Sequence, residues 1–165
     1  MAEKIMIWAQ TNNGTIGNEL KIPWHQKKDV QFFKAQTTGQ TILMGRNTMA
    51  SFHGRALPNR LNLVLSHQTD LTMPAGFVLV HSLAEAEKMA DARGEKLLII
   101  GGSVVYQTLM ADADELLVTY LDTDFVGDTV MDPVDKTIWQ GEVIAHDLAD
   151  DENDFDFEIV RFTRR

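Results

Sequence analysis

Short apolar runs alternate with segments of helical periodicity over most of the chain. The apolar runs are rich in Ile, Leu and Val, and they predict strands at residues 4–10, 41–45, 61–66, 77–81, 96–100 and 115–121. Apolar positions three and four residues apart predict helices at residues 26–36, 47–52, 83–93 and 103–110. Ser82, with Glu85 three positions later, forms a capping box at the start of the third helix. This alternation predicts an α/β fold.

The C-terminal part of the chain has a different pattern. The sequences GEVIAHDL (141–148) and FDFEIVRFTR (155–164) enclose an acidic stretch and predict an antiparallel hairpin. The earlier strands are almost continuously apolar, which is typical of a sheet covered on both faces. We therefore predict a predominantly parallel, mixed central sheet, flanked by helices on both faces and ending in the hairpin. No linker or repeat divides the chain, so residues 1–165 are expected to form a single domain.

Composition and charge exclude several classes of function. The 165 residues carry a formal net charge of -9, with a pI near 4.9, which would repel a nucleic-acid backbone. There is no cysteine, so disulfides and thiolate metal sites are excluded and a reducing compartment is favoured. The apolar runs are too short to span a bilayer, and the first residues lack a signal peptide pattern. We expect a cytoplasmic protein, and we expect a monomer because nothing indicates an obligate interface.

A glycine pair follows the strand predicted at residues 96–100. Gly101 and Gly102 in GGSVVYQTL allow close approach of a ligand to the backbone. The free N–H groups at the start of the next helix suit a pyrophosphate. A tight turn between strand and helix remains the alternative.

Polar residues follow two other predicted strands. Arg46 and Thr48 stand at a helix entry, where charge and helix dipole stabilise an anion. Ser66, His67 and Gln68 occupy a position where a Rossmann NAD site would present an acid to the ribose. The missing acid and the nearby Arg46 favour a 2′-phosphate, although a solvated arginine remains the alternative. The GxGxxG fingerprint is absent, so an ordinary Rossmann domain is not predicted.

Asp29 is an acid on a predicted apolar helix stripe. It stands next to Val30 and one turn before Phe33. An unpaired buried carboxylate is costly, and burial raises its pKa, so Asp29 has an internal partner or binds a ligand that supplies one. The alternative is an N-cap or first-turn acid that the helix dipole stabilises.

The chain resembles bacterial dihydrofolate reductases over essentially its whole length. The motifs of that family occur in order as WAQTNNGTIGNELKIPWH, DVQFFKAQT, ILMGRNTMASF, RALPNRLNLVLSHQ, LLIIGGSVVYQTLM and ELLVTYLDTDFVGDT, followed by the terminal hairpin. The resemblance implies NADPH-dependent reduction of 7,8-dihydrofolate to tetrahydrofolate. In that reaction hydride passes from nicotinamide C4 to pterin C6, and N5 is protonated.

The resemblance also implies catalytic roles. Asp29 would be the only ionisable side chain in the pterin pocket, where it would bind the amino group and ring N–H of the pterin and assist protonation of N5. Thr119 would support Asp29 through its hydroxyl. Trp24 would hold an ordered water that links protein and pterin, with a core aromatic as the alternative. The ligand would thus supply the polar partner that the apolar stripe lacks.

Further residues are implied to bind the substrate. Arg60 would bind the glutamate α-carboxylate of folate, with a surface ion pair as the alternative. The others would line the pterin and the benzoyl ring, or serve only as core: Ile7, Trp8, Ala9, Val30, Phe33, Phe52, Leu57, Ile100 and Tyr106.

NADPH binding is implied for a larger set. Arg46, Ser66 and His67 would surround the 2′-phosphate, while Asn47, Thr48 and the amides of 102–105 would hold the pyrophosphate. In the family the peptide that matches Gly101-Gly102 is cis. The full set is Ala9, Ile16, Gly17, Asn18, Ile22, Gly45, Arg46, Asn47, Thr48, Leu65, Ser66, His67, Gln68, Ile100, Gly101, Gly102, Ser103, Val104, Val105 and Tyr106.

Residues 14–22 would form a mobile lid over the nicotinamide. Ile22 stands where the family usually has Leu or Met, and it is stiffer at χ1. Asn47 replaces a basic residue of some members, and Val104 is also neutral, so backbone amides are expected to contribute more to pyrophosphate binding.

Other readings remain open. A related riboflavin-pathway pyrimidine reductase would not need Asp29, Phe33 and Arg60 together, and a non-catalytic module could bind a nucleotide without turnover. The histidines lack a metal-ligand spacing such as HExxH, and no GxSxG motif supports a hydrolase. The acidic run at 147–158 is expected to be a solvated hairpin loop, with a cation or partner site as the alternative.

Overall fold

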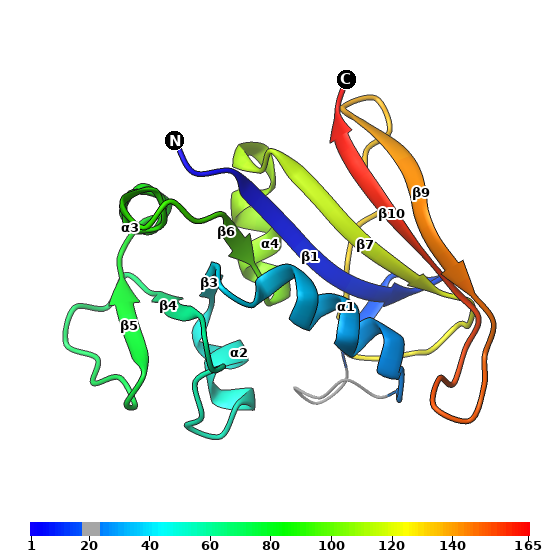
Figure 1. Cartoon of the computed structure of the whole chain (residues 1–165), viewed down its shortest axis with the longest axis horizontal. Coiled ribbons are helices and arrows are strands. Elements are labelled where there is room, and N and C mark those ends of the chain that lie inside the picture. Colours follow the sequence, from blue (N-terminus) through cyan, green and yellow to red (C-terminus); the bar gives the residue numbers. More distant parts are fainter. Residues whose placement is uncertain (18–23) are drawn as a thin grey trace. The chain divides into compact units, whose positions relative to one another are not determined.

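The computed structural model in Figure 1 describes residues 1–17 and 24–165 of the chain. Its contacts divide it into two compact units. The first unit comprises Met1–Met6 and Ala35–Ala113, and the second comprises Ile7–Lys34 and Asp114–Arg165. The expectation of a single domain stays a prediction.

The first unit contains the parallel part of the sheet. Its strand order is β5-β4-β3-β6-β1, and each neighbouring pair is parallel. All residues of β3 and β6 are buried, and because successive side chains of a strand point to opposite faces, both faces of these strands are covered. The bounds are β1 Lys4–Thr11, of which residues 4–6 belong here, β3 Thr41–Met44, β4 Leu61–Leu65, β5 Phe77–Val80 and β6 Leu97–Ile99.

Helices connect these strands. They are α2 Arg46–Ser51, α3 Leu83–Ala92 and α4 Ser103–Leu109, followed by the 3-10 turn η1 Met110–Asp112. The predicted cap of α3 is confirmed, since the Ser82 hydroxyl accepts from the Glu85 amide at 3.1 Å. The Glu85 carboxylate does not return to Ser82 but accepts from the amide of His81 at 2.9 Å. The capping box is therefore displaced by one residue.

The second unit contains the antiparallel part of the sheet and the start of α1 (Figure 1). The strand order is β1-β7-β10-β9, and β10 is antiparallel to both neighbours. The bounds are α1 Lys27–Thr37, β7 Glu115–Leu121, β9 Trp139–Asp147 and β10 Phe157–Arg164. The predicted C-terminal hairpin is confirmed, with a register shift between Ile159 and Val160.

Two short strands were not predicted. β2 (Thr15–Gly17) and β8 (Thr129–Val130) form a small antiparallel sheet. Runs of three and two residues carry too little periodicity to be recognised in a sequence. The turn η1 was not predicted either. The helices α1 to α4 and the other strands lie within two residues of their predicted bounds, and the predicted mixed α/β fold class is confirmed.

None of the helices among the described residues is long and apolar enough to cross a membrane.

Candidate active site

Asp29 lies in the first turn of α1 and is hydrogen-bonded to β7. Thr119, which is 1% exposed, donates its hydroxyl to the Asp29 carboxylate at 2.8 Å, as the family resemblance implied. Burial raises the pKa of Asp29, and the bond from Thr119 opposes this shift. In the part of the chain that the structure describes, no Lys, Arg or His is paired with this carboxylate. Asp29 is thus a first-turn acid whose carboxylate has no cationic partner within residues 1–17 and 24–165.

The surroundings of Asp29 are only partly those expected. Phe33, one turn later, is half-buried, but Val30 is 64% exposed, so the prediction of Val30 on a buried stripe is wrong. The spacing of four residues keeps Phe33 on the side of Asp29, whereas Val30 is rotated by one residue away from it. Trp24 is half-buried and packs against a core cluster around Leu121. It therefore packs as a core aromatic, and its water-binding role stays a prediction.

Other predicted residues of the second unit lie on β1 and β2. Ile7 and Trp8 are buried, and the Trp8 indole donates to the Gln10 side chain at 2.9 Å. Ala9, Ile16 and Gly17 are half-buried. Asn18 and Ile22, with most of the predicted lid, lie outside the described residues.

In the first unit, Gly101 and Gly102 join β6 to α4 through a cis peptide bond. Gly101 has φ +116°, and a Cβ built on it would lie 3.2 Å from the hydroxyl of the buried Tyr106. The Gly45 amide donates to the Gly101 carbonyl at 2.8 Å, which holds the entry of α2 against this turn. A side chain at Gly101 would disturb this arrangement, so the glycine is required here.

Polar groups gather where β4 ends and α2 begins. Arg46 donates to the Gln68 side chain at 2.9 Å, and the Gln68 amide donates to the Ser66 hydroxyl at 3.2 Å. The predicted 2′-phosphate residues Arg46 and Ser66 are therefore linked through Gln68. His67, which stands between Ser66 and Gln68 in the sequence, is exposed. Four further predicted cofactor residues are half-buried or exposed: Asn47, Thr48, Ser103 and Val104. Of two others, Leu65 is half-buried and Val105 is buried.

Arg60 is half-buried in the loop before β4. It donates through Nε to the Pro58 carbonyl and through Nη1 to the Thr37 hydroxyl, both at 2.9 Å. Burial lowers the pKa of its guanidinium, which stays charged at neutral pH. Within residues 1–17 and 24–165 no carboxylate is paired with Arg60, so the alternative of a surface ion pair is not observed. Of its five N–H donors, three have no partner among the described residues and could bind an anionic ligand.

Phe52, Leu57 and Ile100, the other predicted substrate residues of the first unit, are half-buried. Leu57 is fixed by Asn62, which accepts from the Leu57 amide at 3.0 Å and donates to its carbonyl at 2.9 Å. Asn62 also donates to the Arg60 carbonyl at 2.9 Å. The loop that presents Arg60 is therefore built around one side chain.

Several of these supporting residues were missed in the sequence. Asn62 is 1% exposed, and its signal was a polar residue inside the apolar run LNLVL. Thr37 is fully buried two turns after Asp29, and it carried no recognisable signal. His81 contacts the Ser66 carbonyl through Nδ1 at 2.8 Å. Its position at the end of the strand beside β4 was a signal that could have been used.

Comparison with known proteins shows which family the chain belongs to. A family model described as Dihydrofolate reductase matches residues 4–164 of the chain. The chain belongs to the dihydrofolate reductase family. The predicted family and enzyme class are thereby confirmed.

Individual dihydrofolate reductases are similar over nearly their whole length. The enzyme of Haemophilus influenzae is 33% identical over 160 residues, covering 97% of this chain and 98% of its own. The enzyme of Bacillus subtilis is 32% identical over 159 residues, covering 96% and 93%. A solved dihydrofolate reductase from Enterococcus faecalis, complexed with NADP(H) and RAB-propyl, has a TM-score of 0.89 and 34% identity, covering 99% of this chain and 96% of its own.

The part of the chain that the structure describes offers no candidate metal site. Among residues 1–17 and 24–165 no group of three or more His, Asp or Glu side chains is arranged to hold a metal ion.

Proposed function

We propose that this chain reduces 7,8-dihydrofolate to tetrahydrofolate with NADPH, and that Asp29 is the group that makes the reaction effective. The observation that carries this proposal is the Asp29 carboxylate, bonded to Thr119 at 2.8 Å with a raised pKa and no cationic partner among the described residues. A carboxylate in that state suits a ligand with adjacent N–H donors. The amino group and ring N–H of a pterin are such donors.

The residues of the chain would bind the pterin, orient it and tune the charge beside it. Thr119 occupies one oxygen of Asp29 and leaves the other to the pterin. Asp29, near the start of α1, would favour protonation at N5 by placing a negative charge beside the ring. Bound NADPH supplies the hydride. The half-buried Phe33, one turn after Asp29, would exclude water from the pterin.

The predicted cofactor residues fit a phosphorylated dinucleotide. A Cβ on Gly101 would crowd Tyr106 at 3.2 Å, and a Cβ on Gly102 would lie 3.6 Å from the Thr48 hydroxyl. The two glycines add no side chain at the turn where a ligand would approach the backbone. Arg46 and Ser66 supply donors for a 2′-phosphate. The Enterococcus faecalis enzyme of the same fold is complexed with NADP(H), which supports this assignment.

Replacing both Arg46 and His67 with Ala is expected to raise the KM for NADPH by about tenfold or more, because a charge-assisted bond to phosphate contributes about 1.5–3 kcal/mol. NADH lacks the 2′-phosphate, so its KM should hardly change. Steady-state kinetics with both cofactors measures the difference. An equal rise for NADPH and NADH would contradict the 2′-phosphate role.

The function itself is tested by the absorbance of NADPH on mixing with purified protein and dihydrofolate. We expect rapid oxidation that requires dihydrofolate and is much slower with NADH. NADPH binding without turnover would favour the nucleotide-binding module, and turnover only with a pyrimidine substrate would favour the related reductase. The monomeric state, the cytoplasmic location and the lack of nucleic-acid binding stay predictions.

A further inference from the structure

The loop of the β9–β10 hairpin caps the start of α1, the helix that carries Asp29. The amide of Lys27 donates to the Glu152 carbonyl at 3.1 Å, and the amide of Lys28 donates to the Asn153 side-chain oxygen at 2.8 Å. Both segments belong to the second unit, and Figure 1 shows the loop between β9 and β10 beside the beginning of α1. Two N–H groups of the first turn are thus bonded by a loop from the end of the chain.

This cap differs from the usual local one. The first N–H groups of a helix have no partner within it, and a side chain at the N-cap position normally accepts from one of them. Here Gln26 precedes the helix, and its side-chain amide instead donates to the Phe155 carbonyl at 2.8 Å and accepts from the Phe155 amide at 3.2 Å. The capping oxygen therefore comes from Asn153, which lies 125 residues after Lys28.

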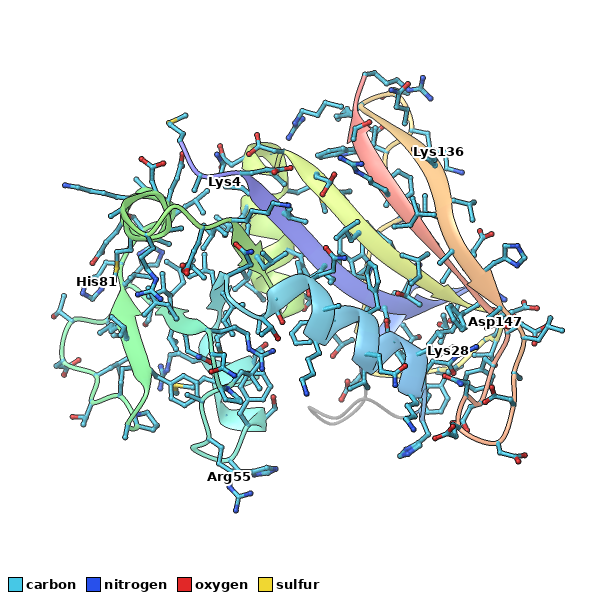
Figure 2. The ribbon with its side chains drawn as sticks, viewed as in Figure 1. Lys4, Lys28, Arg55, His81, Lys136 and Asp147 are labelled. Atoms are coloured by element: carbon cyan, nitrogen blue, oxygen red, sulfur yellow. The ribbon has the colours of Figure 1, made fainter. Side chains whose placement is uncertain are left out.

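Asn153 is itself buried and held by hydrogen bonds to Asp150. It is 2% exposed, its amide group donates to the Asp150 carboxylate at 2.8 Å, and its carbonyl accepts from the Asp150 amide at 2.9 Å. By contrast, the ion pair of Lys28 with Asp147, visible in Figure 2, and the pair of Lys27 with Glu152 are exposed. Exposed pairs of this kind contribute little. The buried Asn153 bond is therefore the stronger anchor of the first turn.

We propose that Asn153 is a positioning residue for catalysis, which fixes the first turn of α1 and thereby the carboxylate of Asp29. Asp29 directly follows the amide that Asn153 binds, and its carboxylate is held on the other side by Thr119. Two fixed points define where the carboxylate lies, and displacement of a catalytic group by about 1 Å can cost up to about 100-fold in rate. The inference rests on the proposed role of Asp29.

The charges around the first turn indicate the expected electrostatic effect. β7 presents the neutral Thr119 to Asp29. Among the described residues, the charged or titratable groups that hydrogen bonds and ion pairs connect at the first turn are His25, Lys27 and Lys28 on or just before the helix and Asp147, Asp150, Glu152 and Asp154 on the hairpin. An ordered helix start stabilises a nearby anion, and the Thr119 bond lowers the pKa of Asp29. Loosening the turn should weaken both effects and raise the pKa of Asp29 further.

The test uses the full chain with Asn153→Ala, which removes the cap. The matched control is Ser82→Ala, which removes the cap of α3, a helix of the first unit. The rescue variant is the exchange Asp150→Asn with Asn153→Asp, which keeps an oxygen for the Lys28 amide and a hydrogen bond between the two side chains. Carbon-13 NMR titration of the Asp29 carboxyl, assigned with Asp29→Asn, is measured together with kcat, the KM for NADPH and the melting temperature.

We expect Asn153→Ala to lower kcat by about 10- to 100-fold and to raise the midpoint of the Asp29 titration, with the KM for NADPH unchanged. The exchange variant should restore kcat and the titration midpoint. Ser82→Ala should lower the melting temperature by a similar amount but leave kcat and the titration midpoint unchanged. If Asn153→Ala does not fold, Asp150→Ala, which removes the exposed carboxylate that holds the Asn153 side chain, is judged by the same criteria. Unchanged turnover and titration would overturn the inference. If the wild type does not reduce dihydrofolate, the proposed function fails separately, and the titration alone decides on positioning.

Discussion

Asp29→Asn is expected to lower the rate of dihydrofolate reduction at neutral pH by about 10²- to 10⁴-fold, the range that general acid-base catalysis contributes. The variant keeps the shape of the side chain and an oxygen for the Thr119 hydroxyl, so the fold should persist. It loses the negative charge that would favour protonation of N5. Steady-state oxidation of NADPH with dihydrofolate measures the loss, and circular dichroism verifies the fold.

The same variant should be more stable than the wild type at neutral pH. Burial raises the pKa of Asp29 in the folded state, so between the unfolded and folded pKa values the unfolded chain binds fewer protons and stability falls as pH rises. Above the folded pKa the ionised carboxylate carries the full desolvation penalty, which Asn does not. The gain in melting temperature should vanish below the ordinary pKa of an aspartate, about 3.9.

These two results together define the role of Asp29. Loss of activity with increased stability is typical of an acid retained for function. Activity equal to the wild type would contradict the assignment of Asp29 as the key acid. Lower stability at neutral pH would instead show that the ionised carboxylate has a stabilising partner.

Arg60→Ala is expected to raise the KM for dihydrofolate by about 10- to 150-fold, the equivalent of the about 1.5–3 kcal/mol of a charge-assisted hydrogen bond. The guanidinium is already oriented by Pro58 and Thr37, so little entropy is lost when the remaining donors bind a carboxylate. Arg60→Lys should be intermediate, since it keeps the charge but loses the planar fork. The measurement is the KM for dihydrofolate with each variant.

A substrate without the glutamate tail separates recognition from folding. With dihydropterin compounds that lack the α-carboxylate, Arg60→Ala and the wild type should have the same kcat/KM. The matched control is Arg55→Ala, because Arg55 lies in the same loop and points away from the protein (Figure 2). A similar loss with the truncated substrate would show that Arg60 acts on the loop and not on the carboxylate.

Much of the fold could be predicted because local patterns and the core agree. The apolar runs that became β3 and β6 are buried along their whole length, and Ser82 caps α3 as predicted. The family's motifs identified Asp29, Thr119, Arg60 and the glycine pair, although local sequence alone left alternatives for each. The bond between Thr119 and Asp29 was implied only by the resemblance, because 90 residues separate them.

The exposure of Val30 was predicted wrongly because a single apolar residue beside Asp29 was assigned to the buried side. Along α1 the half-buried or buried side is defined by Asp29, Phe33 and Thr37, four residues apart, and this phase becomes clear only when the packing is known. The short strands β2 and β8 likewise depend on each other and not on their own sequences.

By itself the sequence determined the alternation of strands and helices, the glycine pair at the end of β6 and the presence of an acid in the first turn of α1. These follow from the periodicity of side chains and from the limited φ and ψ angles of each residue type. Only the tertiary structure decided that Thr119 binds Asp29, that Asn62 shapes the Arg60 loop and that Asn153 caps α1. The physical reason is that these hydrogen bonds join buried polar groups whose partners are chosen by how the strands and loops pack, which no local pattern records.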